Sequence, residues 1–181
     1  MYKIIALIGK AGSGKDTILH EVIAANPDLH EIISCTTRPR REGEVEGVNY
    51  FYLTPEQFGD KVLHDEMLEA TCFNDWFYGT SYDSLRSDVV NVGVFNPTGI
   101  DSLLARPDVE VTVYYIQVSP KTRLLRQLNR EEHPDVAEII RRYSTDEIDF
   151  SDLDFEFIAL MNETVEDLQF NIKEILSSLE R

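Results

Sequence analysis

Residues Gly9–Lys15, GKAGSGK, have the types and spacing of a loop that binds phosphate groups. The loop follows an apolar run, KIIALIG, and precedes a helical pattern, TILHEVIAAN, which Pro27 ends. Glycines allow backbone N–H groups to turn toward phosphate oxygens, and the N-terminus of the following helix adds partial positive charge. A lysine at the end of the loop reaches the β- and γ-phosphates of a nucleotide. The residues expected to contact these phosphates are Gly9, Gly12, Ser13, Gly14, Lys15 and Thr17.

The residue after Lys15 departs from the usual pattern of such loops. Many of them have a serine or threonine there as a ligand of Mg²⁺, whereas this chain has Asp16 followed by Thr17. A carboxylate is also favoured in the first turn of any helix, because it faces the positive end of the helix dipole. Our hypothesis is that Asp16 belongs to the ATP site and binds Mg²⁺, directly or through water.

A second segment, CTTRPRREGEVEGVNYFYLT, has three arginines within four positions, in a chain whose net charge is −16. So acidic a chain is not expected to bind nucleic acids or anionic membranes in general, because both attract basic surfaces. It can still bind a small anion in a locally basic pocket. Arginine presents a planar fork of donors, and paired arginines suit a phosphate dianion. The arginines of this segment are therefore candidates for a phosphate site.

The apolar runs predict the elements that position these loops. DVVNVGVF, VTVYYIQV and FEFIALM are continuous apolar runs, each followed by a helical segment, which is typical of a parallel sheet covered by helices. HEIISC predicts a short strand, VNYFYL alternates and favours an antiparallel strand, and MLEATCF and DWFYG predict further short strands. Thr54, Pro55 and Gln57 predict a helix start with a capping box. We therefore expect an α/β fold with an antiparallel insertion.

The segment SCTTRPRREGEVEGVNYFYLT resembles the substrate loop of guanylate kinases, whose pattern is S-x-T-T-R-x-x-R-x-G-E-x-x-G-x-x-Y-x-F/Y. FNDWFYGTS is similar to the second substrate segment of that family, and FIALMNET to its C-terminal part. The resemblance implies a P-loop kinase fold: a parallel β-sheet core flanked by helices, an inserted, mostly antiparallel subdomain that binds the nucleoside monophosphate (NMP), and an Arg-rich lid. The single domain, residues 1–181, would comprise a core (1–34 and 84–181), an NMP-binding subdomain (about 35–83) and a lid (about 126–143).

The resemblance also implies a GMP site built from two groups of side chains. Arginines and tyrosine hydroxyls would hold the phosphate, and a carboxylate with two hydroxyls would hold the base. Guanine presents N1–H and N2–H₂ side by side, which one carboxylate can accept together, whereas adenine lacks this pair. Arg40 is outside the family pattern, and we interpret it as a surface residue. The phosphate ligands would be Arg38, Arg41, Tyr50 and Tyr78, and the base ligands Ser34, Glu69 and Thr80.

The region RLLRQLNREEHPDVAEIIRRY resembles the guanylate kinase lid, whose arginines close over the ATP phosphates. Arg126 and Arg130 are four residues apart, so they share one helix face. Either Arg142 or Arg141 is the later lid arginine, because a small difference in length leaves both open. Asn162 matches a position near the adenine. The residues expected to act in catalysis are Lys15, Arg41, Arg130 and Arg142.

Guanylate kinases carry two aspartates just after the third core strand, in the pattern Asp-x-Asp-x-x-Gly. This chain has VFNPTG there, with Val94 and Asn96 at the two positions. The first family aspartate helps to organise magnesium, and the second lies close to the base. The loss of these aspartates could lower activity, shift the magnesium role to Asp16 or alter substrate preference, and we favour the hypothesis that Asp16 takes over the magnesium role.

Together these features predict ATP- and Mg²⁺-dependent phosphorylation of GMP or dGMP. The alternatives are a broader deoxynucleotide monophosphate kinase, a ribose 1,5-bisphosphate kinase, and a noncatalytic guanylate kinase-like binding module. The two cysteines form no disulfide framework, and no signal peptide or membrane span is evident. We therefore expect a cytoplasmic protein that is a monomer or homodimer and that binds neither nucleic acid nor membrane.

Overall fold

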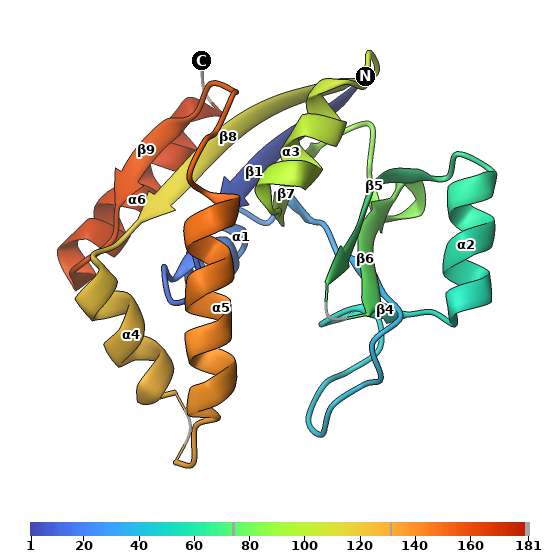
Figure 1. Cartoon of the computed structure of the whole chain (residues 1–181). Helices are drawn as coiled ribbons and strands as arrows, with labels where there is room; N and C mark the ends of the chain where they lie inside the picture. Colours follow the sequence, from blue (N-terminus) through green and yellow to red (C-terminus); the bar gives the residue numbers. More distant parts are fainter. Residues whose placement is uncertain (74, 131, 180–181) are drawn as a thin grey trace. The chain divides into compact units, whose positions relative to one another are not determined.

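The computed structural model describes residues 1–73, 75–130 and 132–179, which form strands β1 to β9, helices α1 to α6 and one 3₁₀ turn (Figure 1). The strands are β1 (Tyr2–Ile8), β2 (His30–Glu31), β3 (Cys35–Thr36), β4 (Phe51–Tyr52), β5 (Met67–Phe73), β6 (Trp76–Ser81), β7 (Val90–Val94), β8 (Val109–Gln117) and β9 (Ile158–Met161). The helices are α1 (Lys15–Ala25), α2 (Pro55–Leu63), α3 (Pro97–Leu104), α4 (Pro120–Leu128), α5 (Val136–Asp149) and α6 (Val165–Ser178), and the 3₁₀ turn is η1 (Tyr82–Ser84).

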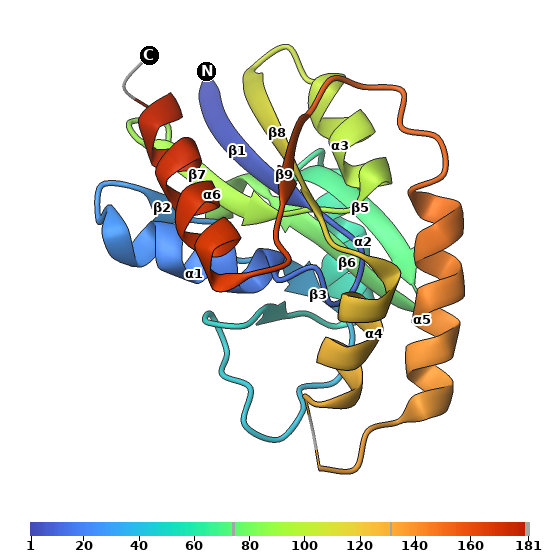
Figure 2. The same ribbon diagram turned by 90° about the vertical axis from the view of Figure 1, so that its left-hand side faces the viewer.

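One sheet has the strand order β2-β7-β1-β8-β9. β2 pairs with β7 and β8 pairs with β9, both in parallel. Helices α1 and α6 pack against each other, as Figure 2 shows. The prediction of an α/β fold with a parallel sheet flanked by helices is confirmed.

The chain divides into two compact units. Unit 1 comprises residues 1–5, 28–93 and 98–111, and unit 2 comprises residues 6–27, 94–97 and 112–181. Each unit has buried apolar residues of its own. In unit 1, Phe58 of α2 packs with Cys35, Met67 and Leu53. In unit 2, buried apolar side chains come from β1, α1, β8 and α6; they include Leu7, Ile8, Ile18, Val22, Ile116 and Ile175.

The other sheet, in unit 1, has the order β4-β3-β6-β5. β6 pairs antiparallel with β3 and with β5, as the sequence predicted for this mostly antiparallel insertion. β4, however, pairs in parallel with β3, so the prediction of an antiparallel strand in VNYFYL was wrong. A tight hairpin would have forced antiparallel pairing, whereas the long connection from residue 37 to residue 50 brings the chain back to run in the same direction.

The prediction of a single strand in HEIISC was also wrong. His30–Glu31 pairs with β7, whereas Cys35–Thr36 joins the second sheet. The helix start at Thr54 is confirmed: Thr54 Oγ1 accepts a hydrogen bond from Gln57 N at 3.2 Å, and Gln57 Oε1 accepts one from Thr54 N at 2.9 Å. Within the described part of the chain, no helix has the length and apolar character needed to cross a membrane.

Candidate active site

The phosphate loop connects β1 to α1 in unit 2, as the sequence predicted. Gly12 and Gly14 have φ angles of +81° and +88°, in the left-handed region that favours glycine. A Cβ atom on Gly12 would lie 2.7 Å from the carbonyl oxygen of Arg123, and one on Gly14 would lie 2.6 Å from Asn162 Nδ2. The loop therefore requires glycine at both positions to keep its shape at the N-terminus of α1.

Two buried polar atoms beside this loop fit a nucleotide site. Ser13 Oγ and Asn162 Oδ1 have no hydrogen-bond partner among the residues that the structure describes, although buried polar atoms are nearly always paired. Asn162 Nδ2 donates to Ser13 O at 2.8 Å, which fixes the orientation of the amide. The amide oxygen is thus held ready for an external donor, which agrees with the predicted place of Asn162 in an ATP site.

Lys15 and Asp16 lie in the first turn of α1. Lys15 Nζ is 3.7 Å from Asp16 Oδ2, and the Asp16 side chain is 70% exposed. Thr17, the next residue, is also exposed. No cluster of three or more His, Cys, Asp or Glu side chains able to hold a metal occurs among the described residues. Mg²⁺ is commonly held by one or two carboxylates together with substrate phosphates, and Asp16 fits that role.

Arg123, which the sequence analysis did not single out, joins the phosphate loop to α5. This arginine is only 2% exposed. Its Nε donates to Ala11 O at 3.1 Å, and its two terminal nitrogens donate to Asp146 Oδ2 at 2.8 Å and Glu147 Oε1 at 2.9 Å. Asp146 Oδ2 also accepts from Ala11 N at 2.7 Å, and the guanidinium lies 4.6 Å from the ring centroid of Tyr143. The network fixes the backbone of the loop.

Of the predicted lid arginines, Arg126 is the one that the structure places against the phosphate loop. Its guanidinium donates to Asn162 O at 2.8 Å and to Ser13 O at 3.3 Å. Arg123 lies three residues earlier in α4, so the two side chains share one face of that helix. This spacing, with the acidic pair Asp146 and Glu147 on α5, is the signal from which Arg123 could have been found.

The other lid arginines have different surroundings. Arg130 is exposed beyond the end of α4. Arg141 and Arg142 both pair with Glu138, at 2.7 and 2.9 Å, and these contacts lower the pKa of Glu138 to about 2. Both therefore stay candidates for the later lid arginine.

Val94 and Asn96, which replace the two family aspartates, belong to unit 2 with the phosphate loop. Val94 ends β7, and Asn96 is exposed. Phe95, between them, donates its backbone N–H to Leu7 O at 3.0 Å, which ties this turn to β1. The turn and Asp16 thus lie in one compact unit, as a shared magnesium role would require.

In unit 1, three of the four predicted phosphate ligands come together. The Arg38 guanidinium lies 5.6 Å from the ring centroid of Tyr50, and the rings of Tyr50 and Tyr78 are 6.1 Å apart. Arg38 is buried, and its Nη1 donates to Pro39 O at 2.8 Å. The fourth predicted phosphate ligand, Arg41, is exposed. The arrangement suits an anion held by a fixed guanidinium and two phenols.

Glu44 orients this cluster and was absent from the predicted site, although the family pattern contains its Gly-Glu pair. Its carboxylate accepts from Arg38 Nη2 at 2.7 Å, from Tyr52 Oη at 2.8 Å and from Arg41 N at 2.8 Å. The hydrogen bond from Arg38 is the main reason why the pKa of Glu44 falls to about 2. Burial, followed by the bond to Glu44, raises the pKa of Tyr52 to about 12.

Two of the predicted base ligands are paired across neighbouring strands of unit 1, and the third, Ser34, directly precedes the next strand, β3. Glu69 of β5 lies opposite Thr80 of β6. β6 pairs Gly79 with Cys35 of β3, so continuing that register by one residue brings Ser34 level with Thr80. Thr80 Oγ1 is buried and makes no hydrogen bond of good geometry to a described residue, but Thr80 still interacts with the Glu69 carboxylate and opposes the rise in its pKa.

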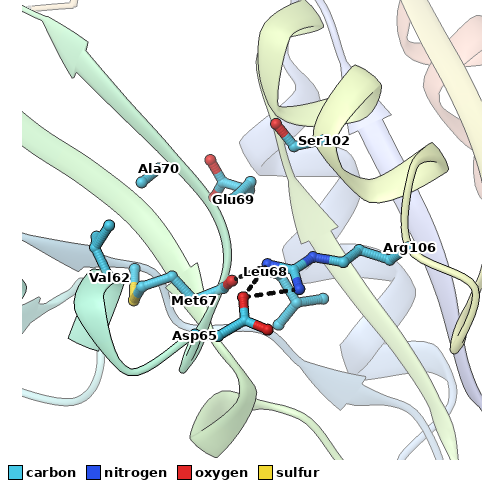
Figure 3. Close-up of a pocket in the computed structure, with 8 residues that line it drawn as sticks. All are labelled: Val62, Asp65, Met67, Leu68, Glu69, Ala70, Ser102 and Arg106. Atoms are coloured by element: carbon cyan, nitrogen blue, oxygen red, sulfur yellow. Dashed lines mark hydrogen bonds and ion pairs between the residues drawn. The ribbon is translucent and has the colours of Figure 1, made fainter.

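Glu69 also borders a cavity of about 250 Å³ in unit 1. Figure 3 shows its carboxylate between β5 and α3, with Ser102 and Arg106 on the α3 side. Glu69 is 9% exposed, and burial raises its pKa to about 7. A buried carboxylate without a cation is costly unless donors face it; Thr80 interacts with it, and a guanine base would supply two further donors.

Comparisons with known proteins show which family and fold the chain shares. The chain is 42% identical over 78 residues to a guanylate kinase of Gloeobacter violaceus, which is 43% of this chain and 38% of that protein. It is 38% identical over 99 residues to a guanylate kinase of Salinibacter ruber, which is 54% of this chain and 50% of that protein. These alignments span half or less of the length of the curated relatives.

Two solved structures have a similar fold. The match to the crystal structure of guanylate kinase from Anaplasma phagocytophilum covers 98% of this chain and 85% of the Anaplasma chain, with a TM-score of 0.70 and 19% sequence identity. The match to an unliganded sugar kinase from a Janibacter species covers 99% of this chain and 95% of the sugar kinase chain, with a TM-score of 0.50 and 15% sequence identity. At these identities the likeness concerns the fold alone. The family model described as guanylate kinase matches residues 1–179, and the chain therefore belongs to the guanylate kinase family.

Proposed function

We propose that the protein transfers the γ-phosphoryl group of ATP to GMP or dGMP, forming ADP and GDP or dGDP. The observation that carries the proposal is the pairing of the buried Glu69 with Thr80, with Ser34 directly before the neighbouring strand β3. One carboxylate accepts both N1–H and N2–H₂ of guanine, and the flanking hydroxyls can donate to O6 or N7. With another base the buried Glu69 would have Thr80 but not the two guanine donors to bond it, and polar sites discriminate strongly in this way.

The transfer needs positioning and charge stabilisation rather than a protein nucleophile. An oxygen of the GMP phosphate, held by Arg38, Arg41, Tyr50 and Tyr78, attacks the γ-phosphorus as the bond to ADP breaks. Charge on the transferring group would be neutralised by Lys15, Arg41, Arg130 and Arg142, while Arg126 and Asn162 hold ATP.

Bound Mg²⁺, with Asp16 as a ligand, would supply further neutralisation of the ATP oxygens. Closure of the lid, residues 126–143, and of the NMP-binding subdomain, residues 35–83, would exclude water and so prevent hydrolysis of ATP. We further propose that the protein acts in the cytoplasm as a monomer or homodimer.

Changing Glu69 to glutamine should lower kcat/KM for GMP by about 100-fold at pH 8, because an amide cannot accept both guanine donors. The carboxylate must be ionised to accept them, and its pKa is raised to about 7. Wild-type kcat/KM for GMP should therefore rise from pH 6 to pH 8 and report this group in the free enzyme. In the glutamine variant, the part of the rise in kcat/KM that comes from ionisation of Glu69 should be absent. The part that comes from ionisation of the GMP phosphate should remain.

An ADP-release assay with GMP, dGMP, AMP, dTMP, UMP and ribose 1,5-bisphosphate tests the proposal and its alternatives together. Wild-type protein that turns over neither GMP nor dGMP, or Glu69→Ala with undiminished turnover of both, would refute it. Urea unfolding provides the folding control. Since Glu69 has a higher pKa when folded than when unfolded, wild-type stability falls as pH rises from about 4.5 to about 7. The glutamine variant should therefore be at least as stable at pH 8.

Changing Asp16 to alanine should raise the Mg²⁺ concentration needed for half-maximal activity by about tenfold at fixed ATP, because a ligand is lost. Magnesium titrations of wild type and variant measure this, and superimposable curves would contradict the assignment. The double variant Asp16→Ser/Val94→Asp restores the family arrangement and should keep activity. A dead double variant would count against compensation between the two positions.

A further inference from the structure

The phosphate loop starts at Gly9, and the next two residues, Lys10 and Ala11, bond to the last turn of α5. Asp146 Oδ2 accepts the backbone N–H of Ala11 at 2.7 Å, and Glu147 Oε2 accepts a hydrogen bond from Lys10 Nζ at 2.7 Å. These partners are 135 and 137 residues apart in sequence, and α5 packs against α4 (Figure 2). The end of α5 therefore holds both the backbone and a side chain of the loop.

The glycines on either side of this pair approach other elements of unit 2. A Cβ atom on Gly9 would lie 2.8 Å from the carbonyl oxygen of Ile116, so the start of the loop touches the backbone of β8. A Cβ atom on Gly12 would lie 2.7 Å from the carbonyl oxygen of Arg123 in α4. The two residues between these glycines are the ones that α5 holds. The first part of the loop is thus fixed by three separate elements.

The charges around this contact balance one another. The guanidinium of Arg123 donates to Asp146 Oδ2 at 2.8 Å and to Glu147 Oε1 at 2.9 Å. With Lys10, two cations face two carboxylates. The hydrogen bond from Lys10, followed by that from Arg123, lowers the pKa of Glu147, so its carboxylate is ionised at neutral pH. Carboxylates beside a phosphate loop do not attract ATP, so their role there is not direct binding.

A loop that binds phosphate through its backbone must point several N–H groups in one direction. Holding a free chain in that shape costs conformational entropy, and a loop that is already fixed avoids this cost when the ligand binds. The N–H of Ala11 donates to Asp146, so this donor holds the loop in place rather than binding a phosphate. The contact with α5 can therefore increase the affinity for ATP without touching it.

We propose that Asp146 is a positioning residue for ATP, which holds the phosphate loop through Ala11 in the shape that receives the phosphates, and that Glu147 assists through Lys10. The inference rests on the proposed function, because it takes ATP as the ligand of the loop. It predicts weaker binding of ATP when either carboxylate is removed. Loss of a negative charge near the loop would by itself strengthen binding of the ATP anion. The direction of the effect thus separates positioning from charge.

Changing Asp146 to alanine tests the proposal. The Kd for ATP, measured by calorimetry without GMP, should rise about tenfold, whereas the KM for GMP at saturating ATP should be unchanged. Asp146→Asn keeps an acceptor for the N–H of Ala11, and its Kd should stay within about threefold of wild type. Asp149→Ala is the matched control, since it removes an exposed carboxylate from the last turn of the same helix. Its Kd for ATP should equal that of wild type.

A measurement without nucleotide separates this proposal from the proposed function. Hydrogen exchange of the Ala11 amide, followed by NMR, should be at least tenfold faster in Asp146→Ala and should stay slow in Asp146→Asn. An unchanged exchange rate in Asp146→Ala, or ATP binding as tight as in wild type or tighter, overturns the proposal. Inactivity of wild type with GMP and dGMP would instead refute the proposed function and leave the exchange test intact.

A second variant covers the case in which Asp146→Ala does not fold. Glu147 is exposed, so Glu147→Ala is expected to fold, and it removes the partner of Lys10. This variant should bind ATP about threefold more weakly than wild type. Unchanged or tighter binding of ATP would overturn the proposal, because charge alone predicts that result.

Discussion

Changing Lys15 to methionine should lower kcat for GMP phosphorylation by about 10³-fold, since one cationic donor to the transferring phosphoryl group is lost. Lys15 lies in the first turn of α1 at the end of a loop that requires glycine at two positions. The substitution keeps the length of the side chain, and the contact of Lys15 with Asp16 is long, at 3.7 Å. The fold should therefore be retained. Steady-state assays with saturating ATP and GMP measure the effect.

Lys121→Met provides the control for this substitution. Lys121 is exposed on α4, so the variant has the same change in charge without loss of a phosphate ligand. Its kcat should stay within about twofold of wild type, as expected of a surface substitution. A Lys15→Met enzyme that is as active as Lys121→Met would show that Lys15 does not act on the transferring group.

Changing Arg123 to methionine should destabilise the protein by about 3–5 kcal/mol, because breaking a buried ion pair leaves an uncompensated charge. Asp146 would keep its hydrogen bond from Ala11 N but lose the cation 2.8 Å away. The contact with Tyr143 would also be lost. Urea unfolding at pH 7 measures the change, with the exposed Arg86→Met as the control.

A second substitution identifies the source of this loss. Adding Asp146→Asn to Arg123→Met removes the orphaned carboxylate and keeps an acceptor for Ala11 N. The double variant should regain part of the stability, since removing both charges costs less than removing one. A double variant that is less stable than Arg123→Met would mean that packing of the arginine, rather than its charge, stabilises the loop.

Local sequence features were sufficient to predict several parts of the fold. The capping box at Thr54 depends on residues three positions apart, and the phosphate loop depends on seven consecutive residues between a strand and a helix. The fold class followed from the alternation of strands and helices. Strand pairing was harder to predict, because the apolar pattern of HEIISC is compatible with one strand although its two halves belong to different sheets.

Some residues of the candidate site could be identified from the sequence, and others were found only in the structure. The sequence, through its family pattern, identified Arg38, Tyr50 and Tyr78, which the structure brings together. Glu44, which orients Arg38, and Arg123, which fixes the phosphate loop, were missed. Glu44 lies within the recognised pattern, but its partners depend on the fold of the loop. The helical spacing of Arg123 from Arg126 is a local signal of a shared face, but it does not show that Arg123 is buried, because its acidic partners are more than 20 residues away.

The sequence alone thus determined the phosphate loop, the helix start at Thr54 and the α/β class, and it supplied the residue types of the proposed base site. The tertiary structure decided how those residues meet. Glu69 and Thr80 share a face because they are paired across β5 and β6. Arg123 reaches Asp146 and Glu147 because α4 packs against α5. Neither arrangement has a periodic signature in the sequence, since each depends on contacts between separate elements. The way in which the site residues meet is therefore set by tertiary packing.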